Sequence, residues 1–165
     1  HYGLLNYVLT LFGFEPFDFK SSVIGTHIAI SAMVIWRWTG YNSIIYLAAL
    51  QSIPHDLYEA ATIDGANKRQ QFFKITIPMI RPMIIFTVIL STIGGMQIFA
   101  EPMTFSGVGG GAQGQGLTIT QLLYEEAFTR QSFGYASALA WVLFFIIVVF
   151  SVINLYFSKK LQSAD

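Results

Sequence analysis

The fold of this chain is decided by the stretch Glu59-Ala60-Ala61-Thr62-Ile63-Asp64-Gly65, followed nine residues later by Ile75-Thr76-Ile77-Pro78. Residues 54–81 around it are polar and cationic, and they lie between two long apolar runs. A membrane protein leaves the bilayer in such a polar loop, because irregular backbone is costly in contact with lipid. The stretch therefore predicts a membrane protein with a solvent-exposed loop at residues 54–81.

The composition favours the same class. Apolar residues make up 54% of the chain and charged residues 11%, and the mean hydropathy is +0.57. The chain has no cysteine, which excludes disulfides and thiolate metal sites. Its net charge of zero argues against a nucleic-acid partner, since phosphates need a basic face. It opens at His1 without a signal-peptide pattern, so we expect a part of a longer protein.

Three apolar segments are long enough to cross a bilayer, at about residues 22–53, 75–100 and 133–157. Each exceeds the roughly 20 residues that cross a hydrocarbon core. We predict an all-α, polytopic transmembrane fold over residues 1–165, with three spanning helices. The first segment is over-long for one span, and we expect it to break or bend at residues 40–43.

The positions of the cations predict the orientation. Six of the nine Lys and Arg residues lie in the 54–81 loop or after the third segment. Under the positive-inside rule, this loop and the C-terminus are cytoplasmic and the N-terminal segment lies outside. The six are Lys68, Arg69, Lys74, Arg81, Lys159 and Lys160.

A short helix is predicted inside the loop, from Asp56 to Asp64. Asp56 followed three residues later by Glu59 is typical of a capping box at a helix start. Gly65 stands where a left-handed C-terminal cap is needed. Small residues on one side of this helix permit close approach of another surface. Pro78 and Pro82 are expected to begin the second membrane helix.

The glycine-rich stretch at residues 107–116 does not predict a nucleotide site. Gly111 and Gly116 have phosphate-loop spacing, but Leu117 stands where the phosphate-binding lysine is required. We expect a flexible connection on the outer side. The histidines have no metal-ligand spacing, and no Ser, His and Asp set can be assembled, so neither catalysis nor a metal or other cofactor is predicted.

Polar and aromatic groups within the spans are the candidates for a solute site. Arg37 is costly in an apolar span, whereas for His27 we favour a packing role near the outer end. Trp38 and Tyr41 share a helix face and offer flat surfaces that suit sugar rings. An aromatic belt with ordinary helix packing is the alternative, which we favour for Trp36 but not for Trp38 and Tyr41. The candidate substrate-binding residues are Arg37, Trp38, Tyr41, Asn42, Ser91, Gly94, Gly95 and Gln97.

The stretch from Glu59 to Pro78 resembles the coupling motif of ABC importer permeases. The family pattern is Glu-Ala-Ala, three residues, Gly, nine residues and Ile-x-Leu-Pro, and this chain departs from it only at Ile77. The resemblance extends along nearly the whole chain and is closest to the maltose/lactose-type sugar permeases. Other matching stretches are Gly3-Leu4-Leu5-Asn6, Trp38-Thr39-Gly40-Tyr41, Leu50-Gln51-Ser52-Ile53-Pro54 and Gln97-Ile98-Phe99.

The resemblance implies a transport mechanism. The loop helix would dock into a groove of an ATPase subunit, where Glu59 accepts charge-assisted hydrogen bonds, in addition to or instead of capping its helix. Two homologous permease subunits, two cytoplasmic ATP-binding subunits and an extracellular or periplasmic solute-binding protein would import sugar across a bacterial or archaeal cell membrane by alternating access. Members have about six spans, so the N-terminal half is expected to be missing. The coupling residues implied are Glu59, Ala60, Ala61, Asp64, Gly65 and Pro78.

Three alternatives remain open at this point. An intramembrane enzyme would need a paired catalytic set inside the spans, and the sequence offers none. A scaffolding membrane protein would have no reason to carry the full Glu59 to Pro78 spacing. Permeases for amino acids, peptides or other small solutes share weaker versions of the motif, and the aromatic residues near Trp38 favour sugar over these.

Overall fold

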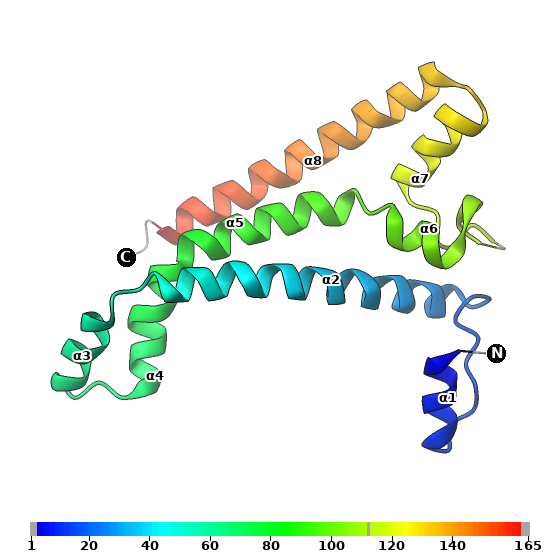
Figure 1. The fold of residues 1–165 in the computed structure, drawn as a ribbon. Coiled ribbons are helices and arrows are strands. Elements are labelled where there is room, and N and C mark those ends of the chain that lie inside the picture. The colour runs from blue at the N-terminus through cyan, green and yellow to red at the C-terminus, as the bar shows by residue number, and fades with distance from the viewer. Residues whose placement is uncertain (1–2, 112, 163–165) are drawn as a thin grey trace. The chain divides into compact units, whose positions relative to one another are not determined.

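All regular secondary structure in the described part of the chain is helical, which confirms the predicted all-α class (Figure 1). The computed structural model describes residues 3–111 and 113–162, without the side chains of residues 5 and 159–162. His1 and the side chains of Lys159 and Lys160, which entered the predictions, therefore lie outside it. In chain order the helices are α1 Leu4–Leu11, α2 Val23–Gln51, α3 His55–Ile63, α4 Lys68–Gln71, the π-helix η1 Phe72–Thr76, α5 Ile77–Met96, α6 Ala100–Ser106, the 3-10 helix η2 Val108–Gly110, α7 Ile119–Tyr124, the π-helix η3 Glu125–Thr129 and α8 Phe133–Gln162.

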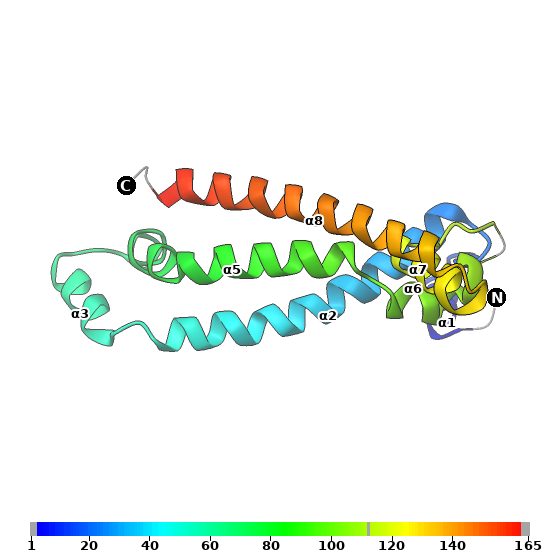
Figure 2. The ribbon, with the colours of Figure 1, turned by 90° about the horizontal axis from the view of Figure 1, so that it is seen from above.

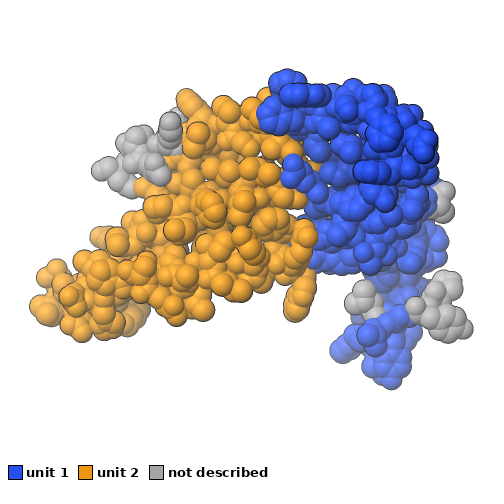
Figure 3. All heavy atoms as spheres, turned by 45° about the horizontal axis from the view of Figure 1, so that its top comes forward, with its two compact units in different colours: residues 1–35, 97–146 blue, residues 36–96, 147–165 orange. Residues whose placement is uncertain are grey.

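The chain divides into two compact units, which Figure 3 colours separately. The first unit comprises His1–Ile35 and Gln97–Ile146, and the second comprises Trp36–Met96 and Ile147–Asp165. The long helices α2 and α8 each contribute residues to both units. The loop helix α3 and most of the candidate solute residues belong to the second unit.

The first unit holds the glycine-rich stretch, in which the N–H of Gly116 donates to the carbonyl of Gly110 at 2.8 Å. The backbone N–H of Gly109 donates to the buried carboxylate of Glu125. A Cβ at Gly110 would lie 2.3 Å from the backbone nitrogen of Leu117, so close backbone contact requires glycine there. His27 Nε2 donates to the carbonyl of Gln115 at 2.8 Å, which confirms its packing role.

The second unit is built on three helical segments that run alongside one another, as Figures 1 and 2 both show for parts of α2, α5 and α8. A small apolar cluster lies at the α3 end of this unit. Ala49 and Ile53, near the C-terminal end of α2, pack there against Ile80 of α5. Tyr58 of α3 packs against the same cluster, so α3 is attached to the membrane helices by apolar contact as well as by its short connections.

The helix that contains α5 begins ten residues before Pro78, so neither Pro78 nor Pro82 begins it, contrary to our prediction. Residues Lys68–Met96 form one helical run of 29 residues. Its first turn is closed by a capping box between Asn67 and Gln70. A proline ring inside a helix clashes with the carbonyl four residues earlier. The π-helical turn η1 lies immediately before Pro78 and changes the hydrogen-bond register there, which relieves that clash.

Two helices in the described part are long and apolar enough to cross a membrane, Lys68–Met96 and Phe133–Ser158. They correspond to the second and third predicted segments, although the second ends at Met96 rather than residue 100. Helix α2 is also 29 residues long, yet it falls outside this pair because polar residues interrupt its apolar surface. It is continuous through residues 40–43, so the predicted break is wrong. Helical hydrogen bonds simply continue past Gly40, which costs only about 1 kcal/mol in a helix.

Candidate functional site

Helix α3 ends as the sequence predicted, with a left-handed glycine. Gly65 has φ of +79° and directly follows the C-cap residue Asp64. The N–H of Gly65 donates to the carbonyl of Thr62 at 3.0 Å, and the N–H of Ala66 donates to that of Ala61 at 2.9 Å. This pair of hydrogen bonds defines a Schellman motif, which satisfies carbonyls that the helix end would otherwise leave free. Gly65 therefore turns the chain from α3 toward α4.

Two polar contacts hold one face of α3 against the start of the next helix. The Tyr58 hydroxyl hydrogen-bonds to the hydroxyl of Thr76 in η1 at 2.8 Å. Thr62 lies one turn further along α3, and its hydroxyl accepts a hydrogen bond at 2.8 Å from the buried side chain of Gln71 in α4. Tyr58 and Thr62 are four residues apart and so lie on the same face of the helix. This face joins α3 to the segment that leads into the α5 membrane helix.

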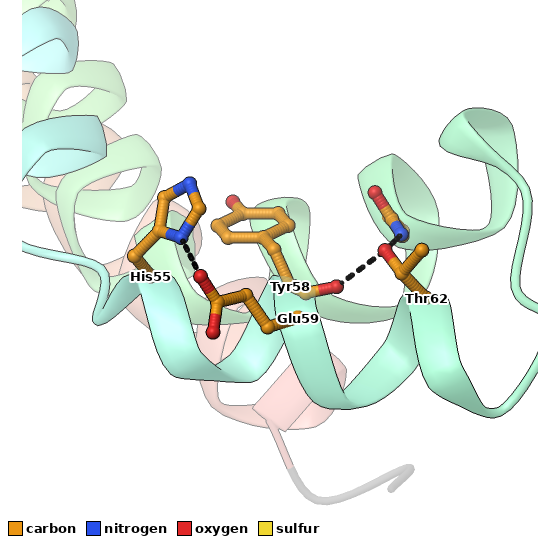
Figure 4. A network of polar contacts seen from close by, with 5 residues as sticks. His55, Tyr58, Glu59 and Thr62 are labelled. Atoms are coloured by element: carbon orange, nitrogen blue, oxygen red, sulfur yellow. Dashed lines mark hydrogen bonds and ion pairs between the residues drawn. The ribbon is translucent and has the colours of Figure 1, made fainter.

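An adjacent side of α3 is open to solvent and carries Glu59. Figure 4 shows Glu59 beside His55, with 3.1 Å between Glu59 Oε1 and His55 Nδ1. The two side chains are 68% and 81% exposed, and Ile63 on the same side is 86% exposed. The predicted capping box is wrong. Pro54 is the N-cap and no side chain caps the helix, because α3 begins at His55 and Asp56 already lies inside its first turn. The Glu59 carboxylate is therefore free of a capping role.

The structure also places the small residues of the coupling motif. Ala60 is exposed and Ala61 is half-buried, and no residue of α3 is fully buried. Leu57 is 41% exposed. The predicted row of small residues therefore faces partly toward solvent and partly toward the protein. Pro78 stands near the start of α5, just beyond the π-helical turn.

Trp38 and Gly94 of the predicted solute site are in direct contact. A Cβ at Gly94 would lie 2.2 Å from Cζ2 of Trp38, so the indole ring rests against the backbone of α5. Tyr41 meets the same ring edge-to-face, with 5.7 Å between centroids, and the Arg37 guanidinium lies 5.7 Å from the centroid. Gly94 thus allows close packing of two helices, whereas Gly95 faces open space. The two glycines have different roles that sequence spacing did not separate.

A polar groove lined by residues of α2 and α5 lies one helical turn from this contact. Asn42 Nδ2 donates to the Ser91 hydroxyl at 3.2 Å, and both residues line a groove of about 320 Å³. The Trp38 Nε1 and Asn42 Oδ1 atoms are buried without a hydrogen-bond partner among the described residues. Both atoms lie on the same face of α2, but only Asn42 lines this groove, whereas Trp38 lines a neighbouring pocket with Arg37 and Tyr41.

Sequence reasoning missed four residues of this groove, Val88, Thr92, Tyr46 and Thr87, and the last two form a pair. Their hydroxyls hydrogen-bond to each other, and Thr87 is only 1% exposed. A signal was available, because Tyr46 lies four residues after Asn42 and Thr87 four residues before Ser91. This spacing puts each pair on one helix face. Gln97 belongs to the first unit, where it is exposed beyond the end of α5, whereas the groove belongs to the second unit.

These features define the class as a multi-helix membrane protein with a capped loop helix attached to a membrane helix. A family model described as binding-protein-dependent transport system inner membrane component matches residues 4–163. The chain belongs to this family, which confirms the resemblance seen in its coupling motif and places it among transport subunits rather than enzymes.

Known relatives extend this finding. The chain is 37% identical, over 99% of its length, to the arabinooligosaccharides transport system permease protein AraP of Halalkalibacterium halodurans, of which it covers 51%. It is 38% identical, over 96% of its length, to the lactose transport system permease protein LacF of Rhizobium radiobacter, of which it covers 54%. The chain therefore spans about half the length of these relatives.

A solved structure shares the fold. The crystal structure of a bacterial alginate ABC transporter in complex with an alginate pentasaccharide-bound periplasmic protein includes a chain that superposes with a TM-score of 0.77 at 23% identity. The match covers 96% of the present chain and 55% of that chain. At this identity the likeness supports the fold alone.

Proposed function

We propose that this chain is part of the membrane-spanning permease subunit of an ATP-driven importer, and that the complete subunit moves a sugar across the cell membrane by alternating access. The observation that carries the proposal is helix α3. It ends in a Schellman motif at Gly65, is hydrogen-bonded to the α5 helix run through Tyr58 and Thr76, and leaves Glu59 exposed. A force applied to its outer face would be transmitted to a membrane helix.

The proposed topology has three spans, with α2 as the first. Its 29 residues rise about 43 Å, enough for a hydrocarbon core of about 30 Å. The polar residues that reduce its hydropathy include Asn42 and Tyr46, which hydrogen-bond to α5 and so need not meet lipid. Cation placement then puts α3 and the C-terminus in the cytoplasm.

In this proposal α3 docks with a cytoplasmic ATP-binding subunit. Glu59 supplies the charged contact, and Ala60 and Ala61 permit close approach. Asp64 and Gly65 end the helix, and Pro78 lies where the π-helical turn passes into α5. The other proposed partners are a second homologous permease subunit and an extracellular or periplasmic solute-binding protein.

The proposed sugar site is the groove beside Trp38. The unpaired Trp38 N–H and Asn42 oxygen suit a hydroxyl group, which both accepts and donates hydrogen bonds. Tyr41 and Ser91 add an aromatic edge and a hydroxyl, and Gly95 leaves room. Arg37, which lies against the Trp38 ring, and Gln97, in the first unit, stay candidates from the sequence. Relatives named for arabinooligosaccharide and lactose transport support sugar over other small solutes.

The test is uptake by the complete permease, assembled with its ATP-binding subunits and binding protein in proteoliposomes, across a panel of labelled oligosaccharides and non-sugar solutes. Tyr41→Ala should raise the half-saturating sugar concentration by roughly 5- to 150-fold, the effect of losing about 1 to 3 kcal/mol. Ile44→Ala, at an exposed position of the same helix, is the matched control. Uptake of a non-sugar solute alone would contradict the substrate assignment, and wild-type behaviour of Tyr41→Ala would remove that residue from the site.

A further inference from the structure

The helix run Lys68–Met96 has an uneven distribution of charge. Four cations, Lys68, Arg69, Lys74 and Arg81, lie in its first half, and no acidic residue occurs between Gly65 and Ala100. Lys68, Arg69 and Lys74 are exposed, and no ion pair joins them to a carboxylate within the described residues. Their charge is available to an external anion.

Two aromatic rings adjoin these cations. Phe72 and Phe73 are 48% and 59% exposed, and their rings meet edge-to-face with centroids 5.2 Å apart. Each ring lies four residues after a cation, Phe72 after Lys68 and Phe73 after Arg69, which puts ring and cation on neighbouring turns of one face. Further along, Met79, Met83 and Phe86 are also about half exposed. The exposed surface of the helix therefore changes from cations and aromatic rings near its start to mainly apolar side chains further along.

This gradient matches the depth profile of one leaflet. Lys68 to Lys74 cover about 9 Å along the helix axis, similar in scale to a headgroup layer. Cations belong at the headgroup level, aromatic rings at its boundary, and aliphatic side chains among the acyl chains. Clusters of Lys and Arg immediately beside a membrane helix attract anionic lipids.

We propose that Lys68, Arg69 and Lys74, together with Phe72 and Phe73, form a binding site for anionic phospholipid headgroups. The cations pair with the headgroup phosphates, and the two rings pack beside the upper acyl chains. The inference is independent of the sugar assignment, because it concerns the surface of the α4–η1–α5 run and not the groove beside Trp38. A protein partner that covers this surface is the competing outcome.

The experiment uses the complete transporter in nanodiscs of phosphatidylcholine mixed with an equal amount of phosphatidylglycerol. Spin-labelled phosphatidylglycerol and phosphatidylcholine report the relative association of each lipid with the protein. We expect wild type to prefer phosphatidylglycerol, and the preference to fall at high salt because exposed charges are screened. Each cation near an anionic surface contributes about five-fold, so Lys68→Gln/Arg69→Gln/Lys74→Gln should lose ten-fold or more of the preference.

Two variants make the result specific. Lys68→Arg/Arg69→Lys/Lys74→Arg keeps every charge and should keep the preference. Lys20→Gln removes one exposed cation from the first unit and should also leave it unchanged. Equal association of the two lipids with wild type would overturn the proposal, as would retention of the preference in the triple Gln variant. Loss of ATP-binding subunits from that variant, with lipid preference intact, would assign the surface to a protein partner instead.

Discussion

The loop helix α3 and the contact between α2 and α5 both carry functional candidates, yet they are held in opposite ways. No residue of α3 is fully buried, and its position depends on backbone turns, two polar contacts and the apolar contact of Tyr58. At the α2–α5 contact, Thr87 is 1% exposed and Trp38 lies directly against Gly94. A surface helix of this kind exposes a residue such as Glu59 for a partner, whereas an internal contact of this kind fixes the distance between two membrane helices.

The largest expected effect follows from Glu59→Ala on α3. Since Glu59 does not cap its helix, its loss should leave the membrane fold intact. Loss of a desolvated charged contact at a subunit interface costs about 2 to 5 kcal/mol, or about 30-fold or more in affinity. Transport by the complete importer should therefore be uncoupled from ATP hydrolysis, as measured by sugar uptake and by ATPase activity in parallel.

The matched control is Asp56→Ala, which removes another exposed carboxylate from the same helix. It should retain transport and copurify with the ATP-binding subunits as wild type does. If Glu59→Ala also copurifies normally and transports at the wild-type rate, α3 does not use this carboxylate for docking.

At the internal contact, the comparison is sharpened by a pair of neighbouring glycines. Gly94→Ala places a Cβ against the Trp38 ring, and overpacking of this kind costs about 1 to 3 kcal/mol. Gly95→Ala adds the same methyl group to open space and should be neutral or slightly stabilising. Thermal unfolding of the complete permease in detergent measures both. Equal melting temperatures for the two variants would mean that the indole ring moves aside without cost.

The predictability of the two regions differs for a physical reason. The end of α3 is decided by local backbone geometry, and Gly65 in the right place was enough to predict its left-handed conformation. The start of α3 was predicted one residue late, because Pro54 rather than a side-chain cap precedes it. The start of the α4–η1–α5 run was predicted too late, because prolines usually begin helices and we therefore placed the start at Pro78. The π-helical turn that accommodates Pro78 has no evident sequence pattern.

The α2–α5 contact depends on which residues meet across helices, and no spacing within one segment contains that information. The sequence therefore indicated Trp38, Asn42, Ser91 and Gly94 as polar or small interruptions but did not pair them. It also missed Thr87, although the spacing of four residues to Ser91 puts the two on one helix face. The break expected at residues 40–43 is absent for the same reason, since Asn42 hydrogen-bonds to Ser91 of α5 and the helix continues past it.

The backbone turn at Gly65 is tested by two replacements made in parallel. A residue with a Cβ costs about 1 to 2 kcal/mol in the left-handed conformation, and a β-branched one is the least suited. Gly65→Val should therefore lower transport and increase proteolysis of the 54–81 loop, while Gly65→Asn should be milder. The space around Gly65 is open, so any loss reports the backbone and not a clash. Equal activity of the two variants would show that the turn relaxes without affecting α3.

The smallest expected effect concerns the buried hydroxyl pair of Tyr46 and Thr87. Thr87→Val preserves shape and removes the hydroxyl, and single hydrogen bonds between membrane helices average about 0.6 kcal/mol. The same substitution at Thr92, which receives a hydrogen bond from Asn154 of α8, makes a matched pair of variants in neighbouring turns of α5. Each should lower the melting temperature of the complete permease slightly. If the groove binds sugar, both variants should also change the half-saturating concentration, because Thr87 and Thr92 line that groove, and loss of the Thr87 hydroxyl frees the Tyr46 hydroxyl to rotate. A change in stability without a change in sugar dependence would make the hydroxyl pair a structural contact alone, and would move the proposed site toward Trp38 and Tyr41.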